Sequence, residues 1–235
     1  MAYFQGAGYI GSDLTRRETA HRGVVTTFRL ASGVAGHGQL WIDIEAWGNQ
    51  AGILNVHGHE GRGVMVNGRL TQKSWQDRDT HEQRSRLIVT AHDFDFLDEQ
   101  ARSQAIDVTN QVTAHGRVEG RPRPDTHDSS NVLFTLVDGR AGNKTGRVSI
   151  PVLAWGRRAD AARGLQPNDR IVVSGRLSYR RESDHQPKRG HYFVNLYGLH
   201  RSSHLAVPGL DTDPQQACHA ANSNATVAPT VRCGP

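Results

Sequence analysis

Apolar and polar residues alternate with a period of two along much of this chain. In residues 40–47, LWIDIEAW, the apolar positions on one side are Leu40, Ile42, Ile44 and Ala46. This is the pattern of a strand with one buried face. Similar β-rich runs occur near residues 24–30, 64–75, 87–96, 132–136, 150–154, 171–173 and 192–197. The pattern therefore predicts an all-β protein made of short strands.

Two sequence motifs occur twice, in the same order. IDIEAWGNQA at 42–51 is echoed by IPVLAWGRRA at 150–159, and VMVNGRL at 64–70 by IVVSGRL at 171–177. The first pair has an offset of 108 residues, from Trp47 to Trp155, and the second has 107, from Gly68 to Gly175. Two matches at nearly one offset indicate a duplicated domain, since solenoid repeats have much shorter periods.

The duplication divides the chain into residues 1–105, residues 108–205 and a tail, 206–235. Each copy contains about five short strands, with room for a short helix after the third at 49–60 or 157–166. This order predicts two tandem five-stranded OB-fold barrels. Residues 111–118 are expected to form the first strand of the second barrel. The tail has no periodicity and few large apolar residues, so we expect it to be disordered.

Composition excludes several classes of protein. No apolar run approaches the roughly 18 residues of a membrane span, and the first residues, MAYFQGAGYIGSD, do not resemble a secretory signal. The two cysteines, Cys218 and Cys233, are too few for a disulfide framework or a cysteine zinc cluster. We therefore expect a cytoplasmic protein.

Large aromatic residues occupy outward positions in the first copy. The outward side of the strand at 40–47 carries Trp41, Asp43, Glu45 and Trp47, and the next long strand carries Arg69, Lys73 and Trp75. Aromatic rings among cations on an exposed sheet suit single-stranded nucleic acid, because bases stack on the rings and cations follow the phosphates. The alternative is that these tryptophans are buried in a subunit interface or under a loop.

The first copy resembles the bacterial single-stranded DNA-binding proteins. GYIGSDLTRRETAHRGVVTTFRLA, QLWIDIEAWGN, GRGVMVNGRL and GRLTQKSW resemble successive strands of that family, with aromatic residues where the family stacks DNA. The resemblance implies that Trp41, Trp47 and Trp75 stack bases. It also implies sequence-independent binding of single-stranded DNA in replication, recombination or repair, without a cofactor or catalysis. Relatives with two barrels per chain form dimers, so a homodimer with four barrels is expected.

The second copy keeps fewer of these aromatic positions. Trp155 matches Trp47, whereas Ser149 and Glu182 replace Trp41 and Trp75. Three tyrosines are candidate substitutes, Tyr179, Tyr192 and Tyr197. The alternation in its strand places Tyr179 on the inward side, among candidate core residues.

Positive charge is concentrated in the second copy. The whole chain carries a net charge of +5, of which residues 108–205 carry +8, residues 1–107 carry −2 and the tail −1. A basic groove would bind phosphates without sequence preference, although a solvated basic face is the alternative for any single arginine. The main cations are Arg121, Arg123, Arg157, Arg158, Arg176, Arg180, Arg181, Lys188 and Arg189. The strand pattern places Arg180, Arg181, Lys188 and Arg189 in the loop between the fourth and fifth strands.

The end of the tail departs from the family. The tail ends in PTVRCGP, without the acidic, phenylalanine-containing tip through which the family recruits enzymes, so recruitment by that route is not expected.

Two other functions stay open. One alternative is an OB-fold adaptor of a replication-restart or mobile-element complex. The other, less favoured, is a metal-dependent nuclease with a site built from His57, His59, Glu60, His92 and Asp93.

Overall fold

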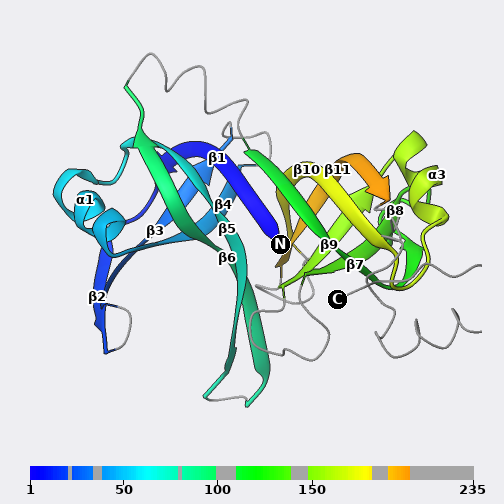
Figure 1. Cartoon of the computed structure of the whole chain (residues 1–235), viewed down its shortest axis with the longest axis horizontal. Coiled ribbons are helices and arrows are strands. Elements are labelled where there is room, and N and C mark those ends of the chain that lie inside the picture. The colour runs from blue at the N-terminus through cyan, green and yellow to red at the C-terminus, as the bar shows by residue number, and fades with distance from the viewer. Residues whose placement is uncertain are drawn as a thin grey trace, which may run out of the picture. The chain divides into compact units, whose positions relative to one another are not determined.

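The computed structural model describes residues 1–20, 23–33, 39–78, 81–98, 110–138, 148–181 and 190–201. The first half contains β1 (Ala2–Ile10), β2 (Thr15–Thr19), β3 (Gly23–Ser32), β4 (Leu40–Trp47), α1 (Asn49–His57), β5 (Gly63–Gln76) and β6 (Gln83–Phe96). The second half contains β7 (Asn110–Pro124), β8 (Val132–Asp138), β9 (Val148–Ala154), α3 (Arg157–Arg163), β10 (Arg170–Arg181) and β11 (Gly190–Arg201). Figure 1 shows these elements, coloured from blue at the N-terminus toward red at the C-terminus.

The strands of each half pair in a closed ring. In the first, β1 pairs with β5, β5 with β6, β6 with β4, β4 with β3, and β3 returns to β1. In the second, β7, β10, β11, β9 and β8 pair in that order and β8 returns to β7. The corresponding pairs β4–β6 and β9–β11 are parallel and the others antiparallel. The all-β, OB-fold prediction is confirmed, and a short helix follows the third strand of each ring as expected.

A shared edge joins the two barrels. Strand β1 of the first barrel pairs antiparallel with β7 of the second, from Ala2 opposite Ala114 to Gly6 opposite Asn110. All eleven strands of the described residues therefore belong to one hydrogen-bonded sheet, and Figure 1 shows β1 and β7 side by side. Residues 111–118 lie inside β7, as the sequence predicted.

The period-two pattern places the core. Alternate residues of β4, among them Ile42 and Ile44, are fully buried in the first barrel, and Ile150 and Val152 of β9 take the same place in the second. Helix α1 buries Leu54 against the first barrel, and α3 buries Ala159 against the second. Burial of such apolar side chains, worth about 1.5–3 kcal/mol for a large one, is the main force that holds each ring closed.

The duplicated motifs carry glycines that the fold requires. Gly48 and Gly156 have φ values of 57° and 55°, a left-handed conformation that turns the chain from the third strand into the helix. Gly68 and Gly175 lie at register shifts of β5 and β10. A Cβ atom there would lie 2.5 Å from the carbonyl oxygen of Thr90 or 2.1 Å from that of Asn195, so only glycine lets the neighbouring strand pass.

Two regions differ from the sequence prediction. The first loop of copy one contains a further strand, β2, which pairs with β3 to form a hairpin. Strands β5 and β6 continue beyond the barrel as a paired arm. The arm ends where Gln76 of β5 lies opposite Gln83 of β6, and Figure 1 shows it projecting from the ring.

The predicted domain boundaries near residue 106 and residue 206, and the tail itself, lie outside the described residues. Within the described ranges, no helix is long and apolar enough to cross a membrane.

Candidate nucleic-acid interface

Strand β4 presents Trp41 on the outer surface of the first barrel. Its side chain is 41% exposed. A Cβ atom on Gly11 would lie 2.4 Å from the indole, so the absent side chain of Gly11 makes room for the ring. Trp47, at the other end of β4, is half-buried opposite Val25. The two aromatic positions predicted on this strand thus share a face, with more of Trp41 available to a ligand.

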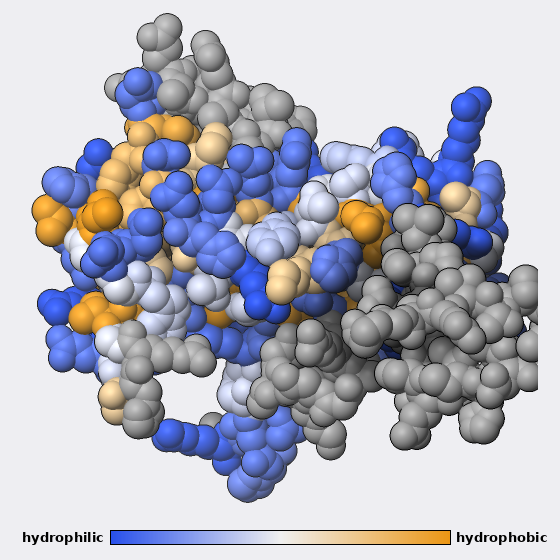
Figure 2. Space-filling view, viewed as in Figure 1, coloured by the Kyte–Doolittle hydropathy of each residue, from blue (hydrophilic) through white to orange (hydrophobic). Residues whose placement is uncertain are grey.

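The β5–β6 arm carries the third predicted tryptophan. Trp75 lies opposite Arg84 and is 43% exposed. The guanidinium carbon of Arg86 lies 5.9 Å from the centre of its ring, within cation–π range. Hydrophilic side chains cover the arm in Figure 2. Trp75 therefore combines an accessible ring with a neighbouring cation, the combination that stacks a base and holds its phosphate.

The carboxylates beside the tryptophans are neutralised by cations. Asp43 accepts from Arg29 at 3.3 Å and pairs with Arg86 at 2.7 Å. Glu45 was expected on the solvated side with Trp41, and this prediction is wrong, because Glu45 is 4% exposed. Its carboxylate is covered and pairs with the ammonium group of Lys73. The predicted DNA-binding residue Lys73 therefore has its charge balanced by Glu45.

Arg69 points toward the second barrel. Its guanidinium lies 3.8 Å from the carboxylate of Asp138, which is buried at the end of β8. The α-amino group of Met1 reaches the other oxygen of Asp138 at 2.5 Å. In this arrangement Arg69 contributes to the joint between the barrels.

The second barrel has its own aromatic surface. Trp155, just after β9, is 46% exposed, and the guanidinium carbon of Arg158 lies 5.0 Å from the centre of its ring. Arg158 also donates to the backbone oxygen of Tyr197 at 2.7 Å, and the Tyr197 ring is exposed. Trp155, Arg158 and Tyr197 therefore form a second cluster of aromatic and basic groups.

The predicted basic loop is only partly a loop. Arg180 and Arg181 are the last residues of β10, which extends further than the pattern indicated. The guanidinium of Arg180 donates to both oxygens of the buried Asp125, at 3.0 and 3.1 Å, so Arg180 is an ion-paired residue of the barrel. Lys188 and Arg189 lie outside the described residues. Of the other cations that the sequence singled out in the second copy, Arg121, Arg123 and Arg157 are exposed to solvent, and Arg158 and Arg176 are partly buried.

The two tyrosines of β10 and β11 meet the first barrel. Tyr179 was predicted to face inward, and this is wrong, because its ring is 43% exposed. Its strand runs on past the buried Leu177, so the inward side of β10 has no core to face at that point. The Tyr179 ring centre lies 5.1 Å from that of Tyr192, and the Tyr192 hydroxyl donates to the backbone oxygen of Trp41 at 2.5 Å. Burial, with a smaller effect of Asp43, raises the pKa of Tyr192 to about 12.

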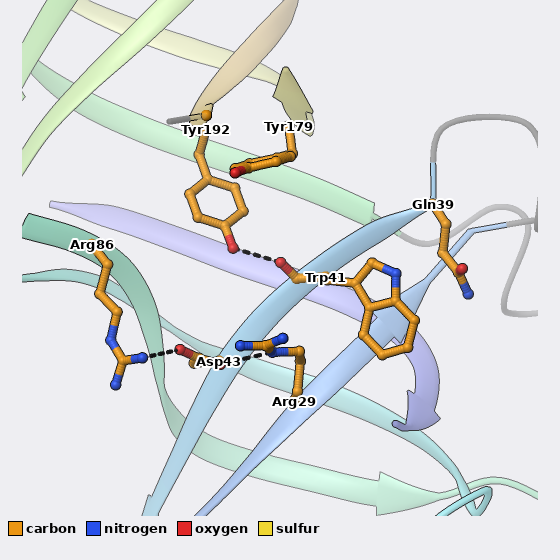
Figure 3. A pocket seen from close by; sticks show the side chains of 8 residues that line it. Arg29, Gln39, Trp41, Asp43, Arg86, Tyr179 and Tyr192 are labelled. Carbon is orange, nitrogen blue, oxygen red and sulfur yellow. Dashed lines mark hydrogen bonds and ion pairs between the residues drawn. The ribbon is translucent and has the colours of Figure 1, made fainter. Parts of the chain in front are cut away.

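These tyrosines and Trp41 border a cavity of about 800 Å³ between the barrels (Figure 3). Its lining consists of Arg29, Gln39, Trp41, Asp43 and Arg86 from the first barrel and Tyr179, Gly190 and Tyr192 from the second. Sequence reasoning did not find this site, since it depends on how the barrels meet. The available signal in the sequence was Arg29, an exposed arginine on β3, the strand next to β4 with its tryptophans.

The histidines considered for a metal site are spread over several segments. His57 ends α1, His59 and Glu60 follow it, and His92 and Asp93 lie on β6. Among the described residues, no group of three or more His, Cys, Asp or Glu side chains is placed to share a metal ion.

The part of the chain that carries the three tryptophans Trp41, Trp47 and Trp75 is similar in sequence to known proteins. Residues 5–97 match the model of the single-strand binding protein family. The first barrel of this chain is therefore similar to that family. Single-stranded DNA-binding protein 1 of Chlorobaculum tepidum is 34% identical over 98 residues, which are 38% of this chain and 60% of that protein. The Helicobacter pylori single-stranded DNA-binding protein is 34% identical over 74 residues, 32% of this chain and 41% of that protein. The chain thus matches less than two thirds of the length of these relatives.

The fold likeness extends over both barrels. A deletion mutant of the Thermus aquaticus single-stranded DNA-binding protein superposes with a TM-score of 0.64 at 23% identity, covering 91% of this chain and 97% of that one. The wild-type Thermus aquaticus protein gives the same score at 22% identity, covering 85% and 91%. The family model ends with the last strand of the first barrel, β6. The likeness of the second barrel to the Thermus aquaticus structures is therefore a likeness of fold.

Proposed function

We propose that this chain binds single-stranded DNA without sequence preference, and protects it and keeps it unpaired in replication, recombination or repair. The observation that carries the proposal is the pair of exposed tryptophans, Trp41 and Trp75, with Arg86 beside the second ring. Bases in any sequence have a π face, so stacking on such rings is sequence-tolerant. The family match of residues 5–97 supports the same proposal.

The two barrels are proposed to contribute differently. The first barrel supplies the tryptophan face, while the second supplies most of the net positive charge and the smaller cluster around Trp155 and Arg158. Arg176 is proposed as one of the phosphate-binding cations of the second barrel. Its guanidinium nitrogen would lie 3.3 Å from a Cβ atom at Gly33, which places it beside the first barrel.

Titration with oligo-dT tests the proposal. Tryptophan fluorescence is followed at several salt concentrations, and duplex DNA serves as the competitor. Strong quenching, a steep dependence of the binding constant on salt and little affinity for duplex are expected. Trp75→Ala should weaken binding by about 1–3 kcal/mol and leave the salt slope nearly unchanged. Equal affinity for duplex, or tight binding without quenching, would exclude the tryptophans as the DNA platform and favour the adaptor function. Cleavage of DNA that is lost when a chelator is added would indicate the metal-dependent nuclease.

The assembly is proposed to be a homodimer with four barrels acting in the bacterial cytoplasm. The two barrels of this chain support the proposal, because the resemblance to the bacterial single-stranded DNA-binding proteins implies a dimer for chains of this kind. Light scattering is expected to give the mass of two chains, and the mass of a single chain at micromolar concentration would contradict the dimer.

A further inference from the structure

The cavity between the barrels has the composition of a nucleotide site. Aromatic rings come from both sides, with Trp41 on β4 and the Tyr179–Tyr192 pair on β10 and β11. Arg29, Arg86 and Asp43 belong to its lining, so the described cavity lining carries an excess of one positive charge. Its volume of about 800 Å³ lies within the roughly 300–1,000 Å³ typical of small-molecule sites. Rings together with an excess cation suit a base with its phosphate better than an apolar ligand.

Several contacts hold the walls of this cavity in place. The Tyr192 hydroxyl is hydrogen-bonded to the backbone of Trp41, which fixes the second barrel against the tryptophan strand. Asp43 sits between Arg29 and Arg86 and orients both guanidinium groups (Figure 3). Gln72 of β5 accepts from the backbone N–H of Ser149 at 3.0 Å, a further contact between the barrels. A site held open in this way needs little rearrangement to take a ligand.

Tyr179 is the more exposed of the two tyrosines in the cavity. It is 43% exposed, whereas Tyr192 is partly buried and its hydroxyl already donates to the backbone oxygen of Trp41. Tyr179 and Trp41 both line the cavity, as Figure 3 shows. Arg176 reaches the same region, since a Cβ atom at Gly33 would lie 3.3 Å from its guanidinium and 3.9 Å from the Cα of Gln39. Aromatic and basic groups from both barrels therefore meet at this cavity.

We infer that this cavity binds one nucleotide of a single DNA strand, and that the strand crosses there from the first barrel to the second within one chain. The base stacks on Tyr179 near Trp41, and its phosphate lies at Arg29 and Arg86. Tyr179 thereby supplies a ring to the second barrel, in which Ser149 and Glu182 replace two tryptophans. The inference rests on the proposed function, and adds to it the place and residues of the crossing.

Substitution of Tyr179 provides the first test. Tyr179→Ala removes the ring and is expected to weaken binding of oligo-dT about tenfold or more, the lower part of the range for one stacked base. Tyr179→Phe keeps the ring and should bind like the unmodified chain. Tyr3→Ala removes a tyrosine of similar exposure (46%) on β1, outside the cavity lining, and should have no effect. Circular dichroism verifies that each variant is folded.

Crosslinking locates the nucleotide directly. A single 5-iodo-deoxyuridine is moved along an oligo-dT, and the crosslinked peptides of the full chain are identified by mass spectrometry. One nucleotide position is expected to crosslink both to the peptide with Trp41 and to a peptide with Tyr179 or Tyr192. If Trp41 and Trp75 crosslink, Tyr179 and Tyr192 never do, and Tyr179→Ala binds normally, the crossing is wrong while DNA binding stands. If the unmodified chain does not bind oligo-dT, the proposed function itself fails.

Discussion

At the scale of single residues, neighbouring outward positions have different surroundings. Trp41 and Trp75 are exposed as their places in the strand pattern predicted. Glu45 has the same outward parity as Trp41 but is covered and paired with Lys73. Parity specifies the side of the sheet a residue faces, while the arm of β5 and β6 decides how much water reaches it.

The pair of Glu45 and Lys73 yields a prediction that separates a structural role from DNA binding. Lys73→Met leaves the buried carboxylate of Glu45 without its partner. Removing one partner of a fully buried pair costs about 3–5 kcal/mol; because Lys73 is 42% exposed, we expect about 1–3 kcal/mol of destabilisation in urea unfolding. Combining it with Glu45→Gln should restore most of the loss. Unchanged stability together with a smaller salt slope would instead assign Lys73 to a phosphate.

At the scale of elements, the duplicated motifs mark places where the backbone leaves little choice. Gly175 stands where β10 changes register against β11, and Gly68 does the same in β5. The contact that excludes a side chain there is with a backbone oxygen, which no rotamer change can move. This explains why the two copies share a glycine at the same point of the barrel.

Gly175→Ala is therefore expected to destabilise the chain. Overpacking of this kind costs about 1–3 kcal/mol. Gly52→Ala is the matched control, because Gly52 lies in α1 with open space around it and alanine in a helix is favoured over glycine by about 0.5–1 kcal/mol. Thermal unfolding should move in opposite directions for the two variants. A stable Gly175→Ala chain would contradict the close approach of β11.

The end of β10 is anchored by an ion pair. Asp125 follows β7 and is almost fully buried, and Arg180 donates to both of its oxygens while its guanidinium carbon lies 5.1 Å from the centre of the Phe193 ring. The pair connects the end of β7 to the end of β10, next to the tyrosines of the cavity.

Arg180→Ala should accordingly reduce stability more than DNA affinity. The unpaired, buried Asp125 carboxylate is expected to cost about 3–5 kcal/mol, measured by chemical denaturation. Arg157→Ala removes an exposed arginine of the same barrel and should change stability by less than about 0.5 kcal/mol. A stable Arg180→Ala chain with a reduced salt slope would show that Arg180 serves phosphate and not the barrel.

At the scale of the whole compact unit, Met1–Ser202, a few specific contacts among the described residues stabilise the junction between the barrels. The β1–β7 pairing supplies backbone hydrogen bonds, and the Tyr192 hydroxyl binds the tryptophan strand across the gap. Since the tyrosine is neutral when protonated, its raised pKa means that the junction favours the neutral form.

A pH dependence follows from this tyrosine. An unfolded chain loses the tyrosine proton near pH 10, whereas Tyr192 in the folded chain holds it until about 12. Its contribution is complete below pH 10 and is lost as the pH rises through 12. The free energy of unfolding should therefore fall over this interval, and less steeply for Tyr192→Phe, which has no proton to lose. Equal pH profiles for the two chains would contradict the assignment.

The sequence by itself determined the strand pattern, the duplication and the outward tryptophans. Alternation of Ile42 and Ile44 with Trp41 and Asp43 is a local property with a period of two, so it predicts both the strand and its exposed face. The repeated glycines are also visible locally, because close packing of strands restricts those positions in both copies.

Only the tertiary structure decided what lies beside these residues. The ion partners of Glu45, Asp43 and Arg180 come from segments 28, 14 and 55 residues away, and the Tyr192–Trp41 contact spans 151 residues. Local alternation also placed Tyr179 in the core, because it does not reveal where a strand outruns its barrel. Exposure, charge pairing and the cavity depend on how distant strands meet, and a pattern with a period of two residues carries no information about that distance.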